Sequence, residues 1–425
     1  MHYFNYRNDK LFCEDVEVKA LAEEFGTPLY VYSKRTLIEH FEKIKEAFSG
    51  VDSLVCYSVK ANSSLSLLNV LVSRGCGLDI VSGGELNRAK LVNCPAKKIV
   101  YASVGKTEGE IRDAIKYGIL LFNVESLPEL ERINKVAASL KRIQDVALRV
   151  NPDVDAHTHK YITTAKKETK FGIDLAGAKK IFLEAKRKYK NINLNGIHIH
   201  IGSQIIEAKP FVKAVKKVLS LVDQINSAGI NLEYFDIGGG LGIIYDEERP
   251  QTAKDFAASI LPLIKKRDFK IILEPGRFIA GNAGILAAKV LYIKESYRKQ
   301  FVIVDAAMND LIRPSLYNAY HKIVNLSRPP QVLGRRSQIK DRKLVDVVGP
   351  ICESGDFLGK SRILDAVAGD YIAVMSAGAY GFSMSSNYNS RPRPAEVLVD
   401  GSKYYLIRER EDYKDLVRKE KIIKI

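Results

Sequence analysis

The chain has 425 residues, of which 46% are hydrophobic and 27% are charged, a composition typical of globular proteins and long enough for two domains. No apolar run is long enough to span a bilayer, and the opening segment MHYFNYRNDK lacks the apolar core of a signal peptide. We therefore expect a cytoplasmic protein with no membrane partner.

The formal net charge of +16 is compatible with anionic ligands, a membrane surface or nucleic acid. However, the lysines are spread over helical segments such as KAVKKVL, and acidic residues are interspersed among them. There is no arginine-rich tail and no basic stripe interleaved with aromatic residues. We expect a solvated basic surface, with nucleic-acid binding as the weakest alternative.

The five cysteines are scattered along the chain without a CxxC pair. This spacing argues against a disulfide framework and against a structural zinc site. We expect most of them to be small buried side chains, with Cys352 in a different context.

Between about residues 29 and 280, short apolar runs alternate with amphipathic segments, which predicts a parallel sheet. About eight such units in roughly 250 residues favour a closed (β/α)8 TIM-like barrel over an open sheet. The predicted strands are LYVY (29–32), SLVCYSV (53–59), GLDIV (77–81), KIVYA (98–102), ILLFNV (119–124), VALRVN (146–151), IHIHIG (197–202), YFDIG (234–238) and KIILE (270–274).

After residue 280 the pattern changes to strand-like runs with little helix, such as QFVIVDA, YIAVMSA and KYYLIRER. The fold class that we predict is α/β, with a barrel followed by a mainly β domain. The barrel is expected to occupy residues 29–280, and the mainly β domain residues 1–28 and 281–425.

Unusual polar residues stand where several predicted strands end. These are Lys60, Asp79, His200, Gly238–Gly240 and Glu274. In a β/α barrel the carboxyl ends of all strands meet on one face, where the active sites of such folds are built. The sequence therefore predicts that the mouth of the barrel is the functional site.

The types of residue at this mouth suggest a particular cofactor. Lys60 could simply extend its amine into water, but a partly desolvated lysine is also suited to forming a Schiff base. The glycine turn could bind a phosphate, Glu274 could hold a protonated ring nitrogen, and Arg277 could bind phosphate or carboxylate. Each feature is weak alone, since glycines occur in plain turns and EPGR could be a surface ion pair. Together they indicate pyridoxal 5′-phosphate (PLP).

The HIHIGSQ segment places two histidines on one face of a strand. Such a pair can bind a metal, but the sequence offers no obvious third ligand, so we expect no metal. Stacking of at least one imidazole on an aromatic cofactor is the better interpretation.

Seven motifs carry a family resemblance: YSVKAN, HIHIGSQ, DIGGGLG, EPGR, MNDLIRPSLYNAYH, GPICESGDFL and GAYGFSMSSNYNSRPRPAEVLVDG. Together and in this order, up to about residue 400, the chain resembles the diaminopimelate decarboxylases, which are fold-type III, alanine-racemase-like PLP-dependent decarboxylases. One small departure is Ser58, where an alanine is commoner in that family.

The resemblance implies roles for the residues at the barrel mouth. Lys60 would form the Schiff base with PLP, and Glu274 would keep the pyridine nitrogen protonated, so that the ring can accept electrons when CO2 departs. The other residues implied in cofactor binding are Asp79 near the Schiff base, His200 stacked on the ring, Ser203, Gly238, Gly239 and Gly240 at the phosphate, Arg277, and Tyr380 at phosphate or substrate.

The resemblance also implies the substrate, meso-2,6-diaminopimelate, and the products, L-lysine and CO2, in the last step of lysine biosynthesis. Arg277, Arg313, Tyr317, Glu353 and Tyr380 would bind the distal carboxylate and ammonium. A guanidinium matches a carboxylate and would serve no purpose opposite the cationic tail of a simple diamine. Whether Arg277 mainly contacts phosphate or substrate stays open.

The resemblance also implies that Cys352 protonates the carbanion, a reasonable role because a thiol has a pKa within reach of neutrality. The resemblance implies that Cys352 and Glu353 reach the site from the partner subunit of a homodimer. The plainer interpretation of Cys352 is a buried thiol.

Two alternative functions remain, one with a different substrate and one of a different functional class. One is the same chemistry on another amino acid, which substrate profiling would reveal. The other is a PLP-binding protein without catalytic activity, which a turnover assay would reveal; Cys352 and Glu353 argue against it.

Overall fold

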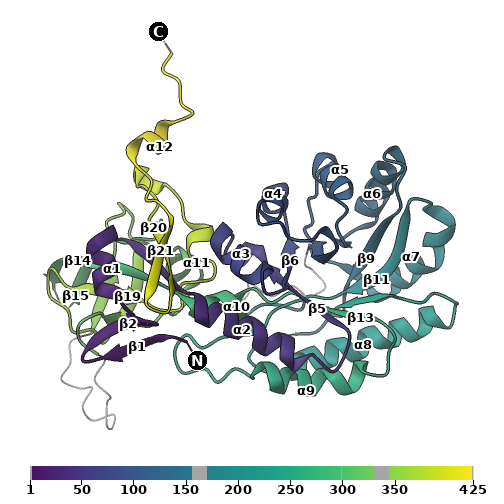
Figure 1. The fold of residues 1–425 in the computed structure, drawn as a ribbon, viewed down its shortest axis with the longest axis horizontal. Coiled ribbons are helices and arrows are strands. Elements are labelled where there is room, and N and C mark those ends of the chain that lie inside the picture. The colour runs from purple at the N-terminus through teal and green to yellow at the C-terminus, as the bar shows by residue number, and fades with distance from the viewer. Residues whose placement is uncertain (1, 156–169, 298, 330–343, 424) are drawn as a thin grey trace. The chain divides into compact units, whose positions relative to one another are not determined.

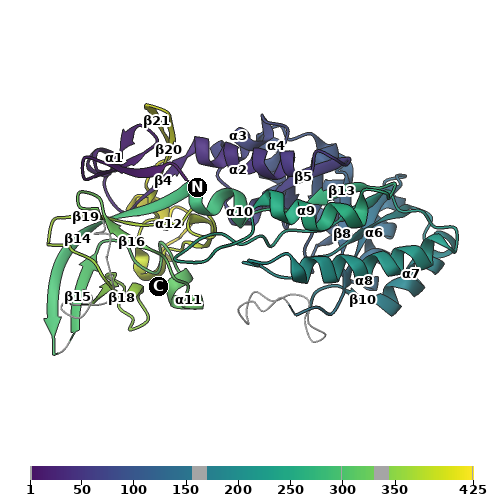
Figure 2. The same ribbon diagram turned by 90° about the horizontal axis from the view of Figure 1, so that it is seen from below.

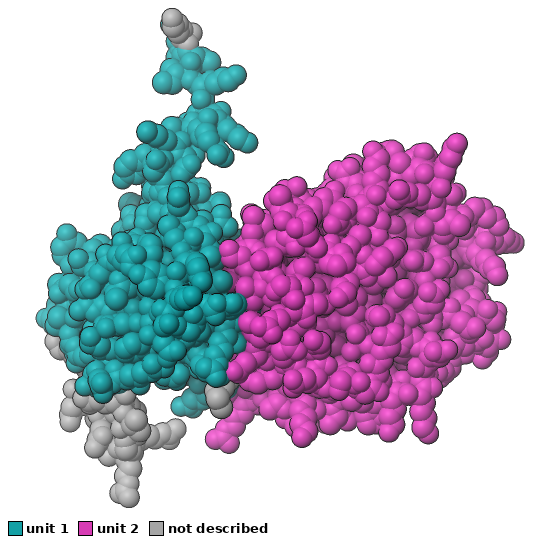
Figure 3. All heavy atoms as spheres, in the orientation of Figure 1, with its two compact units in different colours: residues 1–37, 244–247, 280–425 teal, residues 38–243, 248–279 magenta. Residues whose placement is uncertain are grey.

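The computed structural model describes residues 2–155, 170–297, 299–329, 344–423 and 425. The chain forms two compact units, coloured separately in Figure 3. We call residues 38–243 and 248–279 the barrel unit, and residues 1–37, 244–247 and 280–425 the β unit.

The barrel unit is built on eight parallel strands among its described residues, and the sheet closes because the strand β8 pairs with β9 as well as with β7. The barrel predicted from the alternating pattern is therefore confirmed. The strands are β5 (Ser53–Ser58), β6 (Gly77–Ile80), β7 (Ile99–Tyr101), β8 (Leu121–Val124), β9 (Gln144–Asn151), β11 (Ile192–His198), β12 (Tyr234–Asp236) and β13 (Lys270–Leu273), with the short β10 (Ile173–Asp174) beside β9.

Helices surround these strands (Figures 1 and 2). They are α2 (Lys34–Ala47), α3 (Leu65–Val72), α4 (Gly83–Leu91), α5 (Glu108–Tyr117), α6 (Leu127–Ser139), α7 (Leu175–Lys188), α8 (Lys209–Asn226), α9 (Ala253–Ile264) and α10 (Arg277–Ala280).

Local sequence signals fix where several of these helices begin. Thr107 and Glu110 form a reciprocal capping box at the start of α5, and Ser82 accepts a hydrogen bond from the Glu85 N–H at the start of α4. Because the helices start at defined residues, the preceding loops at the barrel mouth are held at defined positions.

The β unit contains a small antiparallel sheet, the helix α1 (Val18–Phe25) and a larger mixed sheet. The small sheet consists of β1 (Phe4–Arg7), β2 (Lys10–Cys13) and β3 (Val16–Glu17). The larger sheet consists of β4 (Leu29–Ser33), β14 (Gly284–Ser296), β15 (Lys299–Val304), β16 (Ile323–Asn325), β17 (Val345–Val348), β18 (Phe357–Arg362), β19 (Tyr371–Val374), β20 (Ala395–Asp400) and β21 (Lys403–Arg408), accompanied by α11 (Arg313–Tyr317) and α12 (Tyr413–Val417).

One predicted strand lies in a different sheet from the one expected. The run LYVY forms β4, but β4 pairs with β14 and β20 in the β unit and with no strand of the barrel among the described residues. All five residues of β4 are buried, so its run of apolar residues resembles that of a buried barrel strand. Its partners, which are distant in sequence, decide its sheet.

No helix in the described part of the chain has both the length and the apolar character needed to cross a membrane.

Candidate active site

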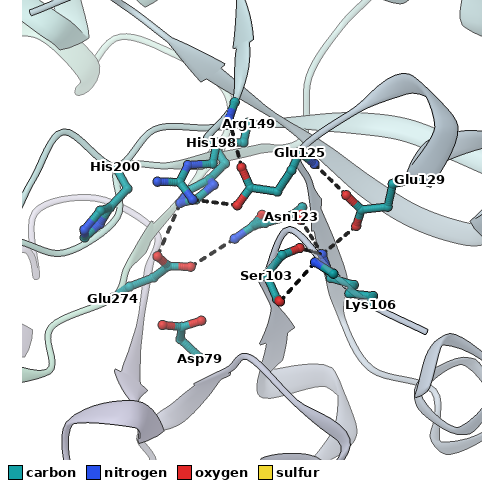
Figure 4. Close-up of polar contacts among 12 residues, drawn as sticks. Asp79, Ser103, Lys106, Asn123, Glu125, Glu129, Arg149, His198, His200 and Glu274 are labelled. Carbon is teal, nitrogen blue, oxygen red and sulfur yellow. Dashed lines mark hydrogen bonds and ion pairs between the residues drawn. The ribbon is translucent and has the colours of Figure 1, made fainter. Parts of the chain in front are cut away.

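The predicted residues of the barrel unit lie at the carboxyl ends of its strands. Lys60 follows β5 in a short 3₁₀ turn (Val59–Ala61), Asp79 lies in β6, and Glu274 directly follows β13. His200 comes two residues after β11, and Gly238 two residues after β12. The closed parallel sheet therefore brings these groups to one end of the barrel, as the sequence predicted. Figure 4 shows Asp79, His200 and Glu274 among them.

Lys60 is oriented by a buried carboxylate. Its Nζ lies 2.9 Å from Asp79 Oδ2, and the Asp79 side chain is fully buried, whereas about a third of the Lys60 side chain is accessible. The Ser58 hydroxyl donates to the same Asp79 oxygen at 2.6 Å, so the serine that departs from the family pattern takes part in the site. Burial raises the pKa of Asp79, and Lys60 opposes that shift.

Glu274 is held by two side chains from β8 and β11, strands of the barrel that do not pair with β13. The Asn123 amide donates to Glu274 Oε1 at 2.9 Å, and His198 Nε2 lies 3.3 Å from Glu274 Oε2. The Glu274 side chain is 3% exposed, and burial alone would raise its pKa. His198 and Lys60 outweigh that effect and lower the pKa of Glu274, so the carboxylate stays ionised.

Asp236 shares the Asn123 amide with Glu274. Asn123 Nδ2 donates to Asp236 Oδ2 at 3.0 Å, and the Gly238 N–H donates to Asp236 Oδ1 at 2.9 Å. Burial, and then the charge of Glu274, raise the pKa of Asp236 well above its usual range. Glu274 is therefore the more acidic of the two carboxyl groups.

The glycine turn after β12 has no room for side chains. A Cβ at Gly239 would lie 2.1 Å from the Glu274 backbone oxygen, and one at Gly240 would lie 2.4 Å from the Gly202 oxygen. Gly240 also has a φ of +112°, which L side chains rarely adopt. The turn is therefore restricted to glycine and stays free of side chains, which suits the close approach of a phosphate.

His200 and Arg277 are placed beside this turn by hydrogen bonds. The Gly239 N–H donates to His200 Nδ1 at 3.3 Å, and Arg277 Nη2 donates to Ser203 Oγ at 3.0 Å. Burial, followed by the charges of Arg149 and Lys60, lowers the pKa of His200 well below its usual value, so the imidazole is neutral. Arg277 is buried, which rules out a plain surface ion pair for EPGR.

A second buried network adjoins Asn123 (Figure 4). Lys106 Nζ lies 2.6 Å from Glu129 Oε1 and also donates to the backbone oxygens of Ser103 and Asn123. Arg149 Nη1 donates to Glu125 Oε1 at 2.6 Å. Burial lowers the pKa of Lys106 and raises that of Glu129, whereas their mutual attraction opposes both shifts.

Within the described residues, one group of side chains could hold a metal ion. The ligand atoms of His198, Asp236 and Glu274 all lie within 4.8 Å of one another. The sequence revealed no such partners for the histidine pair, because Asp236 and Glu274 lie on other strands. That no metal is bound stays a prediction. The same Glu274 carboxylate is the one expected at the cofactor ring.

The β unit carries the remaining predicted residues. Arg313 begins α11 and is buried, and Tyr317 ends that helix partly buried. Tyr380 lies between β19 and β20 with a left-handed backbone, φ 58°. Cys352 and Glu353 lie together on an exposed turn, where the Tyr388 hydroxyl donates to Glu353 Oε2 at 2.8 Å.

The other four cysteines are buried, as expected, and all five are free thiols.

The sequence interpretation missed several residues of the site, namely Asn123, Asp236, His198 as a partner of Glu274, and the network of Lys106, Glu125, Glu129 and Arg149. A signal was available for some of them. Asn123, Asp236 and Arg149 each interrupt an apolar strand close to its carboxyl end, which marks a position facing a polar site.

The comparisons with known proteins agree with this geometry. Residues 34–281 match the family described as "Pyridoxal-dependent decarboxylase, pyridoxal binding domain". Together with the barrel and the lysine, glutamate and glycine turn at its mouth, this match defines a PLP-dependent carboxy-lyase.

Relatives over the whole chain are more specific. A diaminopimelate decarboxylase of Haemophilus influenzae is 47% identical, covering 98% of both chains, and one of Aquifex aeolicus is 50% identical, covering 98% of this chain and 96% of the relative. The structure of diaminopimelate decarboxylase from Helicobacter pylori complexed with L-lysine is 41% identical, with a TM-score of 0.88 over 94% of this chain and 98% of that one. The chain belongs to the diaminopimelate decarboxylase family.

The residues present fit PLP. The amine of Lys60, the ionised Glu274 and the side-chain-free turn of Gly238–Gly240 match the aldehyde, the ring nitrogen and the phosphate of that cofactor. Asp79 Oδ1 is in addition a buried polar atom without a hydrogen-bond partner in the described structure, beside the Lys60 amine.

Proposed function

We propose that this enzyme decarboxylates meso-2,6-diaminopimelate at its D-centre, releasing CO2 and L-lysine, in the last step of lysine biosynthesis. The observation that supports this most strongly is the end-to-end similarity to diaminopimelate decarboxylases in a chain whose barrel mouth gathers the lysine, the carboxylate and the glycine turn.

The cofactor would be held from three sides of the barrel mouth. Lys60 supplies the amine for its aldehyde, and Asp79 holds that amine in place. The turn of Gly238–Gly240, with Ser203 and Arg277, would bind the phosphate; the hydrogen bond from Arg277 to Ser203 favours the phosphate as the main partner of Arg277. His200, kept neutral, covers the ring face.

PLP supplies an electron sink that accepts the electron pair left when the carboxylate departs as CO2. Glu274 maintains that sink because its carboxylate, ionised by its neighbours, keeps a proton on the ring nitrogen. Asn123 donates to one Glu274 oxygen and His198 lies beside the other, so both oxygens have a polar side chain next to them before a ligand binds.

The β unit would select the substrate and complete the active site. Arg313 and Tyr317 bind the distal carboxylate, Glu353 binds the distal ammonium, and Tyr380 contacts the phosphate or the substrate. The Cys352 thiol delivers the proton to Cα after CO2 has left. In this assignment residues 29–280 bind PLP, and residues 1–28 and 281–425 complete the site.

We further propose a homodimer in which Cys352 and Glu353 serve the partner's site, because both lie exposed on one turn of the single chain. The five free cysteines agree with a reducing compartment, in line with a cytoplasmic location.

The test is release of CO2 and lysine from meso-diaminopimelate with PLP present. We expect turnover by the wild type, none by Lys60→Ala, and a raised KM for Glu353→Gln, since the amide keeps the size of the side chain but loses the charge opposite the ammonium. A protein that binds PLP yet leaves diaminopimelate intact would refute the substrate. Failure to bind PLP would refute the site.

A further inference from the structure

The Arg313 guanidinium is held by two neutral side chains of the β unit. Its Nη1 donates to the Tyr245 hydroxyl at 2.9 Å and lies 2.9 Å from His321 Nε2. Its Cζ also lies 4.9 Å from the centroid of the Tyr245 ring. All three side chains are buried, and His321 is fully buried.

The hydrogen-bond chemistry allows one protonation state of His321. A guanidinium only donates, so His321 Nε2 must accept from Arg313. The other ring nitrogen, Nδ1, lies 2.8 Å from the Met375 backbone oxygen, which only accepts. His321 is therefore a neutral imidazole with its hydrogen on Nδ1.

Both supports of the guanidinium are themselves fixed. Met375 follows β19, and its N–H donates to the Lys322 oxygen at 2.8 Å, which ties the segment after His321 to the sheet. The Tyr245 ring meets the His321 ring edge-on, with centroids 5.1 Å apart. The contact atoms therefore have little freedom to move.

These contacts orient Arg313 without neutralising it. A carboxylate in the place of His321 or Tyr245 would cancel the positive charge, whereas a neutral imidazole and a phenol accept from its N–H groups without adding a negative charge. The resulting arrangement suits a guanidinium that must bind a carboxylate of the ligand.

We propose that His321 and Tyr245 are positioning residues that fix Arg313 for the carboxylate that distinguishes the amino-acid ligand from a simple diamine. This inference rests on the proposed function, in which Arg313 binds the distal carboxylate. L-Lysine keeps that carboxylate and cadaverine lacks it, so the ratio of their affinities measures the contribution of Arg313.

The experiment measures binding of L-lysine and of cadaverine to the PLP-loaded enzyme by calorimetry, and kcat and KM for meso-diaminopimelate. For His321→Leu, which removes the acceptor, we expect lysine affinity to fall about tenfold, cadaverine affinity to change less than about twofold, and the loss to appear in KM more than in kcat. His321→Gln, whose amide oxygen can still accept, should recover part of the lysine affinity.

Tyr245→Phe removes only the hydroxyl and provides a milder variant if His321→Leu folds poorly; we expect a smaller loss in the same direction. Tyr413→Phe, an exposed tyrosine of the same unit, is the matched control and should change neither affinity. Thermal unfolding of each variant checks that the fold is retained.

The outcomes separate the two levels of the proposal. If Arg313→Met leaves the ratio of lysine to cadaverine affinity unchanged, the proposed role of Arg313 is wrong. If Arg313→Met changes that ratio but His321→Leu and Tyr245→Phe do not, only the positioning inference fails. A parallel fall in both affinities would assign His321 a purely structural role and overturn the inference.

Discussion

Two polar regions, the mouth of the barrel unit and one turn of the β unit, differ in how far their side chains are exposed. In the barrel unit, the Asp79 and Glu274 side chains are nearly inaccessible, and each is contacted by polar groups from elsewhere in the barrel. In the β unit, Cys352 and Glu353 stand exposed on one turn. The barrel therefore preorganises its charges within one chain, whereas the exposed turn is suited to meeting a group that another molecule supplies.

The first prediction tests this difference by removing one charge from the buried network of the barrel unit. Lys106→Met leaves the buried Glu129 carboxylate without its cation, so we expect the free energy of unfolding to fall by about 3–5 kcal/mol. Urea unfolding followed by circular dichroism measures this loss.

Two controls accompany that measurement. Lys188→Met breaks an exposed ion pair with Glu131 and should give a far smaller loss. Glu353→Gln on the exposed turn should leave the unfolding midpoint unchanged. Equal midpoints for Lys106→Met and the wild type would show that the buried pair does not stabilise the barrel.

The second prediction concerns the pH dependence of stability in the β unit. Burial raises the pKa of Asp310 to about 7, and the folded protein therefore holds a proton there that the unfolded chain releases near pH 4. The folded state binds more protons between these values, so this contribution to stability is complete below about pH 4 and disappears as the pH rises through 7.

Asp310→Asn removes the titrating group. Its unfolding free energy should decline less than that of the wild type between pH 5 and pH 8, by at most about 2.6 kcal/mol, because the difference in proton binding extends only from pH 5 to about pH 7 in this window. Urea titrations at both pH values give the difference. The expectation fails if wild type and variant differ by the same amount at pH 5 and at pH 8.

The smallest expected effect concerns how the barrel orients Glu274. Asn123→Leu keeps the side-chain size but removes the hydrogen bonds to Glu274 and Asp236, so we expect kcat to fall about 10–100-fold. PLP affinity, measured by absorbance titration, should fall as well.

Asn193→Leu changes an exposed asparagine of β11 and should leave both quantities unchanged. Full activity and normal PLP affinity in Asn123→Leu would mean that His198 alone suffices to hold Glu274.

Much of the barrel mouth could be predicted from the sequence, for a local reason. Lys60, Asp79, Glu274 and the glycine turn each follow or end an apolar run, and the barrel topology then requires that they meet. Asn123 and Asp236 could not be paired with Glu274 in advance, because their contacts depend on the order of the strands around the closed barrel and on their register.

The same limit explains β4. A short run of five buried residues fits the barrel or the mixed sheet equally well, and nothing within the run identifies its partners. The tautomer of His321 likewise depends on the oxygen of Met375, which lies far away in the sequence.

The position of β4 has a consequence for how the chain folds as it is synthesised. β4 (Leu29–Ser33) lies between β14 and β20, and it pairs in parallel with β20 (Ala395–Asp400). A ribosome makes β4 before any barrel strand and makes β20 only after all of them. The barrel unit can therefore close while translation continues. The edge of β4 that pairs with β20 stays unpaired until the C-terminal part of the chain has been synthesised.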